Sequence, residues 1–148
     1  MTTIAYNHKD GVIAYDSRLT RGGTICTDSH EKMRVKGDCR FVLCGVESDC
    51  QSFIEHYPEF KQDYTYKCSG VIIRDKKAYS FCFNEEGEYE EFEVTFDEAW
   101  GSGQDHALTA MDCGLNANEA LGMAIKRDSS TGGEIKSTFV SGDSELPI

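Results

Sequence analysis

The second residue of the chain is a threonine that can serve as a nucleophile. Removal of an initiator methionine before a small residue such as Thr2 is ordinary processing, and it would leave Thr2 with a free α-amine beside its own hydroxyl. An α-amine has an ordinary pKa of about 7.7–8.0, so a sizeable neutral fraction can accept the hydroxyl proton at cytosolic pH. Because many chains begin with Met-Thr, this pair indicates nucleophilic chemistry only together with other residues.

A charged pair is predicted near this terminus. Asp16 directly follows the apolar run 12–15, and Lys32 begins another strand-like stretch. If the two strands are neighbours, Asp16 and Lys32 form a partly buried ion pair, and a cation beside Thr2 would lower the pKa of its amine and of its hydroxyl. The alternative interpretation is a surface ion pair of little energetic value.

Turns rich in glycine and hydroxyl groups supply further candidates. Gly45 follows the apolar run 41–44 and precedes a predicted helix, where its backbone N–H would be available to an oxyanion; a plain turn glycine is the alternative. The Gly-Ser-Gly turn 101–103 precedes one predicted helix, and the turn 128–133 follows another, so both are expected at the same end of the helix pair. Neither turn has the spacing of a phosphate-binding loop.

The elements that position these residues are strands and helices in separate runs. Apolar runs, alternation and turn residues predict strands over 2–6, 12–15, 24–27, 40–44, 70–73, 78–83, 89–94 and 134–140. Apolar positions at helical spacing predict helices over 48–57 and 104–113, and a third after an N-cap at Asn116, with Glu119 completing a capping box. This order predicts an α+β layered domain over residues 1–148.

Composition and charge exclude several classes of partner and site. The 148 residues include 15 basic and 26 acidic side chains, and the net charge of −11 argues against nucleic acid or an anionic membrane as partner. No apolar run approaches the roughly 20 residues of a membrane span, and the N-terminus lacks the features of a signal peptide, so a cytoplasmic location is expected. The seven cysteines are expected to be reduced core thiols. The histidines do not cluster at metal-ligand spacing, and we expect no metal and no cofactor.

Taken together, these residues resemble the proteasome β-subunit family of N-terminal-nucleophile hydrolases, which includes HslV, the peptidase subunit of a bacterial two-component protease. The matching segments follow the family's order and span nearly the whole chain: 2–4, 16–20, 32–34, 44–49, 101–103 and 127–133. The resemblance implies a four-layer αββα sandwich. Only residues 59–69 separate the first predicted helix from the next strands, where the family has a second long helix, so a reduced helical layer is expected.

The resemblance also implies a role for each candidate residue. Thr2 would be the nucleophile, with its α-amine as general base; Lys32 would lower the hydroxyl pKa, and Asp16 would hold Lys32. The Gly45 N–H would bind the oxyanion. The cluster around the amine would consist of Ser102, Asp128 and Thr131. The substrate backbone would add as a strand beside Thr20, Arg21 and Gly45. The substrate side chain before the scissile bond would contact Leu19, His30, Arg34, Leu43 and Glu47. Because this set is mixed in charge and polarity, it indicates no preference for one type of substrate side chain.

The predicted function is therefore a threonine-type peptidase or amidohydrolase that acts through an acyl-enzyme on Thr2. The resemblance implies a peptide or protein substrate, a homo-oligomer such as a ring, and an ATPase as a possible partner. Two alternatives remain open. One is a catalytically silent binding or inhibitory module on the same scaffold, favoured by the reduced helical layer. The other is an amidase that acts on a small molecule.

Overall fold

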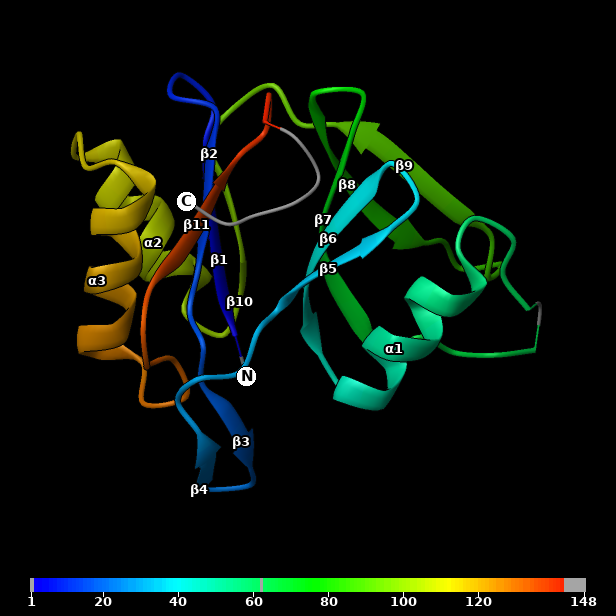
Figure 1. Ribbon diagram of the computed structural model, residues 1–148, viewed down its shortest axis with the longest axis horizontal. Coiled ribbons are helices and arrows are strands. Elements are labelled where there is room, and N and C mark those ends of the chain that lie inside the picture. Colours follow the sequence, from blue (N-terminus) through cyan, green and yellow to red (C-terminus); the bar gives the residue numbers. More distant parts are fainter. Residues whose placement is uncertain (1, 62, 143–148) are drawn as a thin grey trace.

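Two antiparallel sheets lie face to face, with helices on their outer faces (Figure 1). The computed structural model describes residues 2–61 and 63–142. The first sheet comprises β1 (Thr3–Asn7), β2 (Val12–Tyr15), β10 (Glu98–Gly101) and β11 (Lys136–Phe139), in the order β10-β1-β2-β11. The second comprises β5 (Met33–Lys36), β6 (Cys39–Gly45), β7 (Cys68–Arg74), β8 (Lys77–Phe83) and β9 (Tyr89–Glu93), paired in chain order. A separate hairpin consists of β3 (Leu19–Arg21) and β4 (Thr24–Thr27).

The helices complete a four-layer arrangement. α2 (Gln104–Asp112) and α3 (Ala117–Arg127) cover the first sheet, and α1 (Glu47–His56) covers the second (Figure 1). The predicted four-layer αββα sandwich is confirmed, and within the described ranges α1 is the only helix of its layer. No helix in those ranges is long and apolar enough to cross a membrane.

The buried side chains form three clusters: one between the two sheets, one between the first sheet and α2 and α3, and one between the second sheet and α1. Side-chain alternation along the first sheet builds the first two. In β1, Ile4 and Tyr6 point into the core between the sheets, whereas Ala5 faces the helices. In β2, Ala14 likewise faces the helices and packs in the same cluster as the buried alanines of α2 and α3. Because these side chains are small, the helices approach the sheet closely. The turn before α2 and the turn after α3 therefore lie near the N-terminal end of β1.

The third core explains how one helix can cover the five-stranded sheet. Phe53 of α1 is fully buried and stacks on Phe81 of β8 with 4.3 Å between ring centroids. Phe60 and Tyr66, from the segment after α1, pack around the same ring. Aromatic side chains bury a large apolar area each, so they fill the space beside α1.

Two strands were not predicted, and β5 was expected only as a strand-like stretch that begins at Lys32. β3 has three residues, all at least partly exposed, so its sequence carries no alternation. β10 is similarly short, and only Ala99 and Trp100 are buried in it. Trp100 lies in the core between the sheets and donates through Nε1 to Ser80 Oγ at 3.2 Å.

The prediction of core thiols is wrong for three cysteines. Cys44 and Cys50 are buried as predicted, and Cys39 and Cys68 are partly buried. The exposed thiols are those of Cys26, Cys82 and Cys113. Cys26 lies in the hairpin outside both main sheets, and Cys113 caps the C-terminal end of α2, so neither faces a core.

Candidate active site

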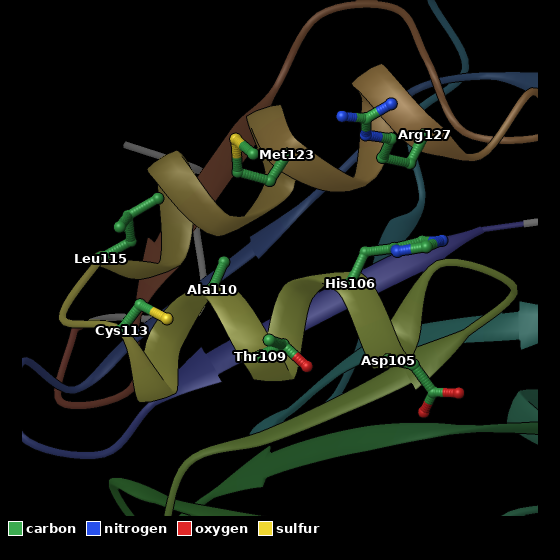
Figure 2. Close-up of a pocket in the computed structure, with 8 residues that line it drawn as sticks. All are labelled: Asp105, His106, Thr109, Ala110, Cys113, Leu115, Met123 and Arg127. Atoms are coloured by element: carbon green, nitrogen blue, oxygen red, sulfur yellow. The ribbon is translucent and has the colours of Figure 1, made fainter.

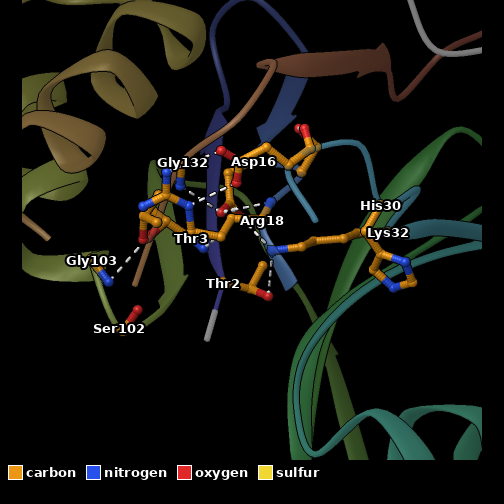
Figure 3. Close-up of polar contacts among 12 residues, drawn as sticks. Thr2, Thr3, Asp16, Arg18, His30, Lys32, Ser102, Gly103 and Gly132 are labelled. Atoms are coloured by element: carbon orange, nitrogen blue, oxygen red, sulfur yellow. Dashed lines mark hydrogen bonds and ion pairs between the residues drawn. The ribbon is translucent and has the colours of Figure 1, made fainter. Parts of the chain in front are cut away.

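The structure brings Thr2, Asp16 and Lys32 together in a buried cluster at the N-terminal end of β1. Lys32 Nζ lies 2.9 Å from Thr2 Oγ1 and 2.7 Å from Asp16 Oδ1, and its side chain reaches toward Thr2 (Figure 3). Residue exposure is 6% for Thr2, 5% for Lys32 and zero for Asp16. The pair predicted from the sequence is therefore a buried ion pair that also donates to a threonine hydroxyl, and the interpretation as a surface ion pair is wrong.

Backbone amides stabilise the Asp16 carboxylate away from water. Oδ1 accepts from Thr3 N at 3.2 Å, and Oδ2 accepts from Gly132 N at 3.0 Å and from Arg18 N at 3.4 Å. A buried carboxylate is costly unless it is paired and hydrogen-bonded, and these donors meet that requirement. Asp16 thereby ties the start of β1 to the loop that follows α3.

The environment of Lys32 lowers its pKa. Burial disfavours the charged ammonium and is the largest effect, while attraction to Asp16 and the hydrogen bond to it act in the opposite direction. The ammonium is thus poorly solvated and held between an anion and a hydroxyl. Such a cation stabilises negative charge that develops on Thr2 Oγ1.

Glu31, which the sequence analysis missed, fixes the start of β5, directly after Lys32. Its Oε1 accepts from Tyr15 Oη at 3.0 Å and from Met33 N at 2.9 Å, and its Oε2 accepts from Lys136 Nζ at 2.8 Å. These partners come from both sheets. Glu31 is therefore a positioning residue for its neighbour Lys32.

A chain of hydroxyl groups extends from β1 to the turn after α3. Gly103 N donates to Thr3 Oγ1 at 3.0 Å, Thr3 Oγ1 lies 2.7 Å from Thr131 Oγ1, and Thr131 Oγ1 donates to Asp128 Oδ2 at 2.6 Å. Because a hydroxyl has a single proton, Thr3 must be the donor to Thr131. Thr3 was missed because nothing in its sequence context separates it from an ordinary strand residue.

The hydroxyls of Ser102 and Thr131 both donate to the Asp128 carboxylate. Ser102 Oγ donates to Asp128 Oδ2 at 2.5 Å, and Ser102 N donates to Thr2 O at 2.9 Å. The turns before α2 and after α3 therefore meet beside Thr2, as expected from the two turn sequences. Gly101 makes this approach possible, since it has a φ of 101° and a Cβ there would lie 1.7 Å from Thr2 O.

Asp128 is expected to contribute to acid stability. Partial burial alone would raise its pKa, but hydrogen bonds from Ser102, Thr131 and Ser130 N lower it overall. A carboxyl group whose pKa is lower in the folded state binds fewer protons than in the unfolded chain, so its contribution holds above about pH 4 and is lost as pH falls through the folded-state pKa. Urea unfolding of Asp128→Asn should lose less stability between pH 5 and pH 3 than the parent; an unchanged pH slope would contradict this assignment.

A cavity of about 420 Å³ opens beside Thr2 and Lys32. Six of the residues predicted to contact substrate line it, together with Gly45: Leu19, Thr20, His30, Arg34, Leu43 and Glu47. Arg21 does not line it and is exposed at the end of β3. The structure thus gathers these residues from β3, the segment before β5, β5 itself, β6 and α1 around one opening.

Arg18 is a further lining residue that the sequence analysis did not single out. Its guanidinium forms a bidentate pair with Asp28 at 2.8 and 3.1 Å, and Nη1 donates to Ser129 O at 3.0 Å. It therefore links three loops next to Asp16. Its place in the matching segment 16–20 is the only signal that could have identified it.

A second cavity, of about 400 Å³, lies in the outer helical layer between α2 and α3 (Figure 2). Its walls are largely apolar and include Ala110, Leu115 and Met123. It shares no residue with the cavity beside Thr2. The candidate site is therefore the Thr2 cavity, where the buried charges gather.

Comparison with known proteins identifies the fold. No family model and no curated protein matches the chain. BPH from Thiobacillus denitrificans, solved in complex with epoxomicin, matches with a TM-score of 0.68 at 17% identity over 95% of this chain and 100% of that chain. HslV from Trypanosoma brucei matches with a TM-score of 0.69 at 16% identity over 92% of this chain and 97% of that chain. The chain therefore has the N-terminal-nucleophile hydrolase fold of the proteasome and HslV type.

Proposed function

We propose that the protein is a threonine-type peptidase or amidohydrolase whose nucleophile is Thr2 after removal of Met1. The observation that carries this proposal is the contact of one buried ammonium, Lys32 Nζ, with both Thr2 Oγ1 and Asp16 Oδ1 at the mouth of a cavity. A purely structural ion pair has no need of a threonine hydroxyl as a third partner. Met1 lies outside the described residues.

The proposed reaction begins with proton transfer from the Thr2 hydroxyl to the Thr2 α-amine, directly or through a water. Oγ1 then attacks the carbonyl carbon of the scissile amide, and the carbonyl oxygen becomes an oxyanion. When the tetrahedral intermediate collapses, the C–N bond breaks and the leaving amine takes the proton from the α-ammonium. Water hydrolyses the resulting ester by the same sequence, with the α-amine again as base. Lys32 supports each step because its charge favours the alkoxide form of Thr2.

Gly45 is proposed as the oxyanion donor. Val46 N donates to Lys67 O on the β7 side of β6, whereas β5 lies on the other side. On that side β5 has already ended, because its pairing reaches only from Lys36 to Met33, which lies opposite Val42. Gly45 also lines the cavity, which supports the proposal that its N–H meets the substrate carbonyl there.

Ser102, Asp128 and Thr131 are proposed to hold the α-amine. Ser102 N fixes the Thr2 carbonyl, and the Asp128 carboxylate accepts from both neighbouring hydroxyls. A carboxylate close to the terminus would attract the α-ammonium that forms during catalysis.

The substrate backbone is proposed to add as a strand between β3 and the end of β6. Thr20 of β3 and Gly45 at the end of β6 both line the cavity, and an extended peptide gains main-chain hydrogen bonds in this mode. Arg21 would contact the peptide farther from the scissile bond. Homo-oligomerisation, a ring with an ATPase partner and a cytoplasmic location belong to this proposal by analogy with the fold.

Intact mass and peptide turnover test the proposal together. We expect the purified protein to lack the mass of Met1 and to hydrolyse fluorogenic peptides. A homogeneous population that keeps Met1 and shows no turnover would instead favour the binding or inhibitory module, for which the single helix of the α1 layer is the supporting observation. Turnover of small amides but not peptides would indicate an amidase.

A further inference from the structure

Two buried polar atoms without a partner lie in the wall of the Thr2 cavity. In the part of the chain that the structure describes, two buried side-chain polar atoms have no hydrogen-bond partner: His30 Nε2 and Arg34 Nη1. Both residues line this cavity. Buried polar atoms are nearly always hydrogen-bonded, so two exceptions at one site call for a partner that the free protein does not supply.

The neighbouring acid does not satisfy these two atoms. Glu47 accepts from the other guanidinium nitrogen, Arg34 Nη2, and its Oε1 lies 3.4 Å from His30 Nε2 without a hydrogen bond. One carboxylate, with 34% of its side chain exposed, thus faces a guanidinium and an imidazole. Because a guanidinium nitrogen can only donate, the missing partner of Arg34 Nη1 must be a hydrogen-bond acceptor.

The charges around the cavity also favour an anion. Although the whole chain carries a net charge of −11, Arg18, Lys32 and Arg34 line this opening and Glu47 is the only acidic residue among its lining residues in the described ranges. Arg18 and Lys32 are paired with Asp28 and Asp16, which do not line the cavity. Arg34 is therefore the cation in the cavity wall whose guanidinium has a buried N–H donor, at Nη1, without a partner.

We infer that the cavity selects an acidic side chain, glutamate or aspartate, in the residue before the scissile bond. This inference rests on the proposed function. The substrate carboxylate would accept from Arg34 Nη1 and from His30 in the tautomer whose proton is on Nε2, while its methylene groups pack against Leu19 and Leu43. An apolar side chain would leave both donors buried and unpaired, and a basic side chain would place a second cation beside Arg34.

A matched set of peptides tests the preference. Fluorogenic tetrapeptides that differ only in the last residue, ending in Glu, Asp, Gln, Leu or Lys, are compared by kcat/KM. We expect the acidic peptides to exceed the Leu peptide by about 10- to 100-fold, the range of a charge-assisted hydrogen bond, with Lys the poorest. A Leu or Lys peptide that is cleaved best would overturn the inference.

Two substitutions separate recognition from a structural role. Arg34→Gln should lower kcat/KM for the Glu peptide by about 10- to 100-fold and change that for the Leu peptide much less. Glu47→Gln should act in the opposite direction on the Glu peptide, because it frees the guanidinium and removes a competing anion. Equal losses for all peptides in both variants would show that the pair only supports the fold and would overturn the inference.

Labelling of Thr2 by epoxomicin shows whether a negative result contradicts only the acidic preference or also the proposed function. A Thr2 adduct together with a preference for Leu or Lys peptides would overturn the acidic preference and leave the proposed function standing. No adduct and no cleavage of any of the five peptides would overturn the proposed function and this inference with it.

Discussion

Replacing Lys32 by methionine is expected to reduce peptide hydrolysis by about 10³-fold, comparable to the loss of a preorganised charge-stabilising donor. The substitution removes the ammonium 2.9 Å from Thr2 Oγ1, so the hydroxyl loses the charge that favours its alkoxide form. It also leaves the fully buried Asp16 carboxylate without its cation, which costs about 3–5 kcal/mol of the free energy of unfolding. Steady-state kinetics and urea unfolding measure the two effects separately.

The double variant Lys32→Met/Asp16→Asn is the matched control. It removes both charges of the buried pair, so much of the lost stability should return, because no unpaired charge remains inside the protein. Activity should not return, since the ammonium beside Thr2 is still missing. Hydrolysis by the double variant at the parent rate would contradict the role of Lys32 in catalysis and reduce the pair to a structural one.

Thr2→Ala is expected to lower hydrolysis by about 10⁴- to 10⁶-fold, which is the range for removal of a catalytic nucleophile. The fold should persist, because Thr2 lies before β1 and its backbone carbonyl still accepts from Ser102 N. Kinetics with the best peptide and thermal unfolding of the same sample measure both properties.

Thr2→Ser is the matched control for this variant. Serine keeps a hydroxyl beside Lys32, and all three residue types at position 2 are small enough for ordinary removal of Met1. We therefore expect Thr2→Ser to retain measurable turnover while Thr2→Ala does not. If alanine supported the same rate as threonine, the nucleophile would have to lie elsewhere in the cavity.

Local sequence patterns predicted the fold well where one segment carries the whole signal. The capping box of α3 is an example: Asn116 and Glu119 bond each other's backbone, and both residues lie within one turn. The strand predicted over 12–15 has the bounds of β2 (Val12–Tyr15) for the same reason. β3 was missed because its short, partly exposed strand has no buried face to produce a pattern.

The charged centre of the site was predictable because Asp16 and Lys32 follow recognisable strand and turn signals and match a family motif. The residues that hold this centre together were not predictable. Thr3 and Arg18 act through contacts with Thr131 and Ser129, more than a hundred positions away in the chain. Such contacts depend on how the two sheets and the α2–α3 pair pack together. Local sequence patterns do not predict that packing.

The central claim is that the processed terminus of the chain supplies the nucleophile, and epoxomicin tests it most directly. The compound is present in the BPH structure that shares this fold, and its epoxyketone warhead requires a free N-terminal threonine. After incubation with the inhibitor, intact-mass and peptide-mapping measurements should show loss of Met1 and one covalent adduct on Thr2, absent from Thr2→Ala. Protein that keeps Met1 and takes up no inhibitor, or an adduct that maps to another residue, would contradict the account.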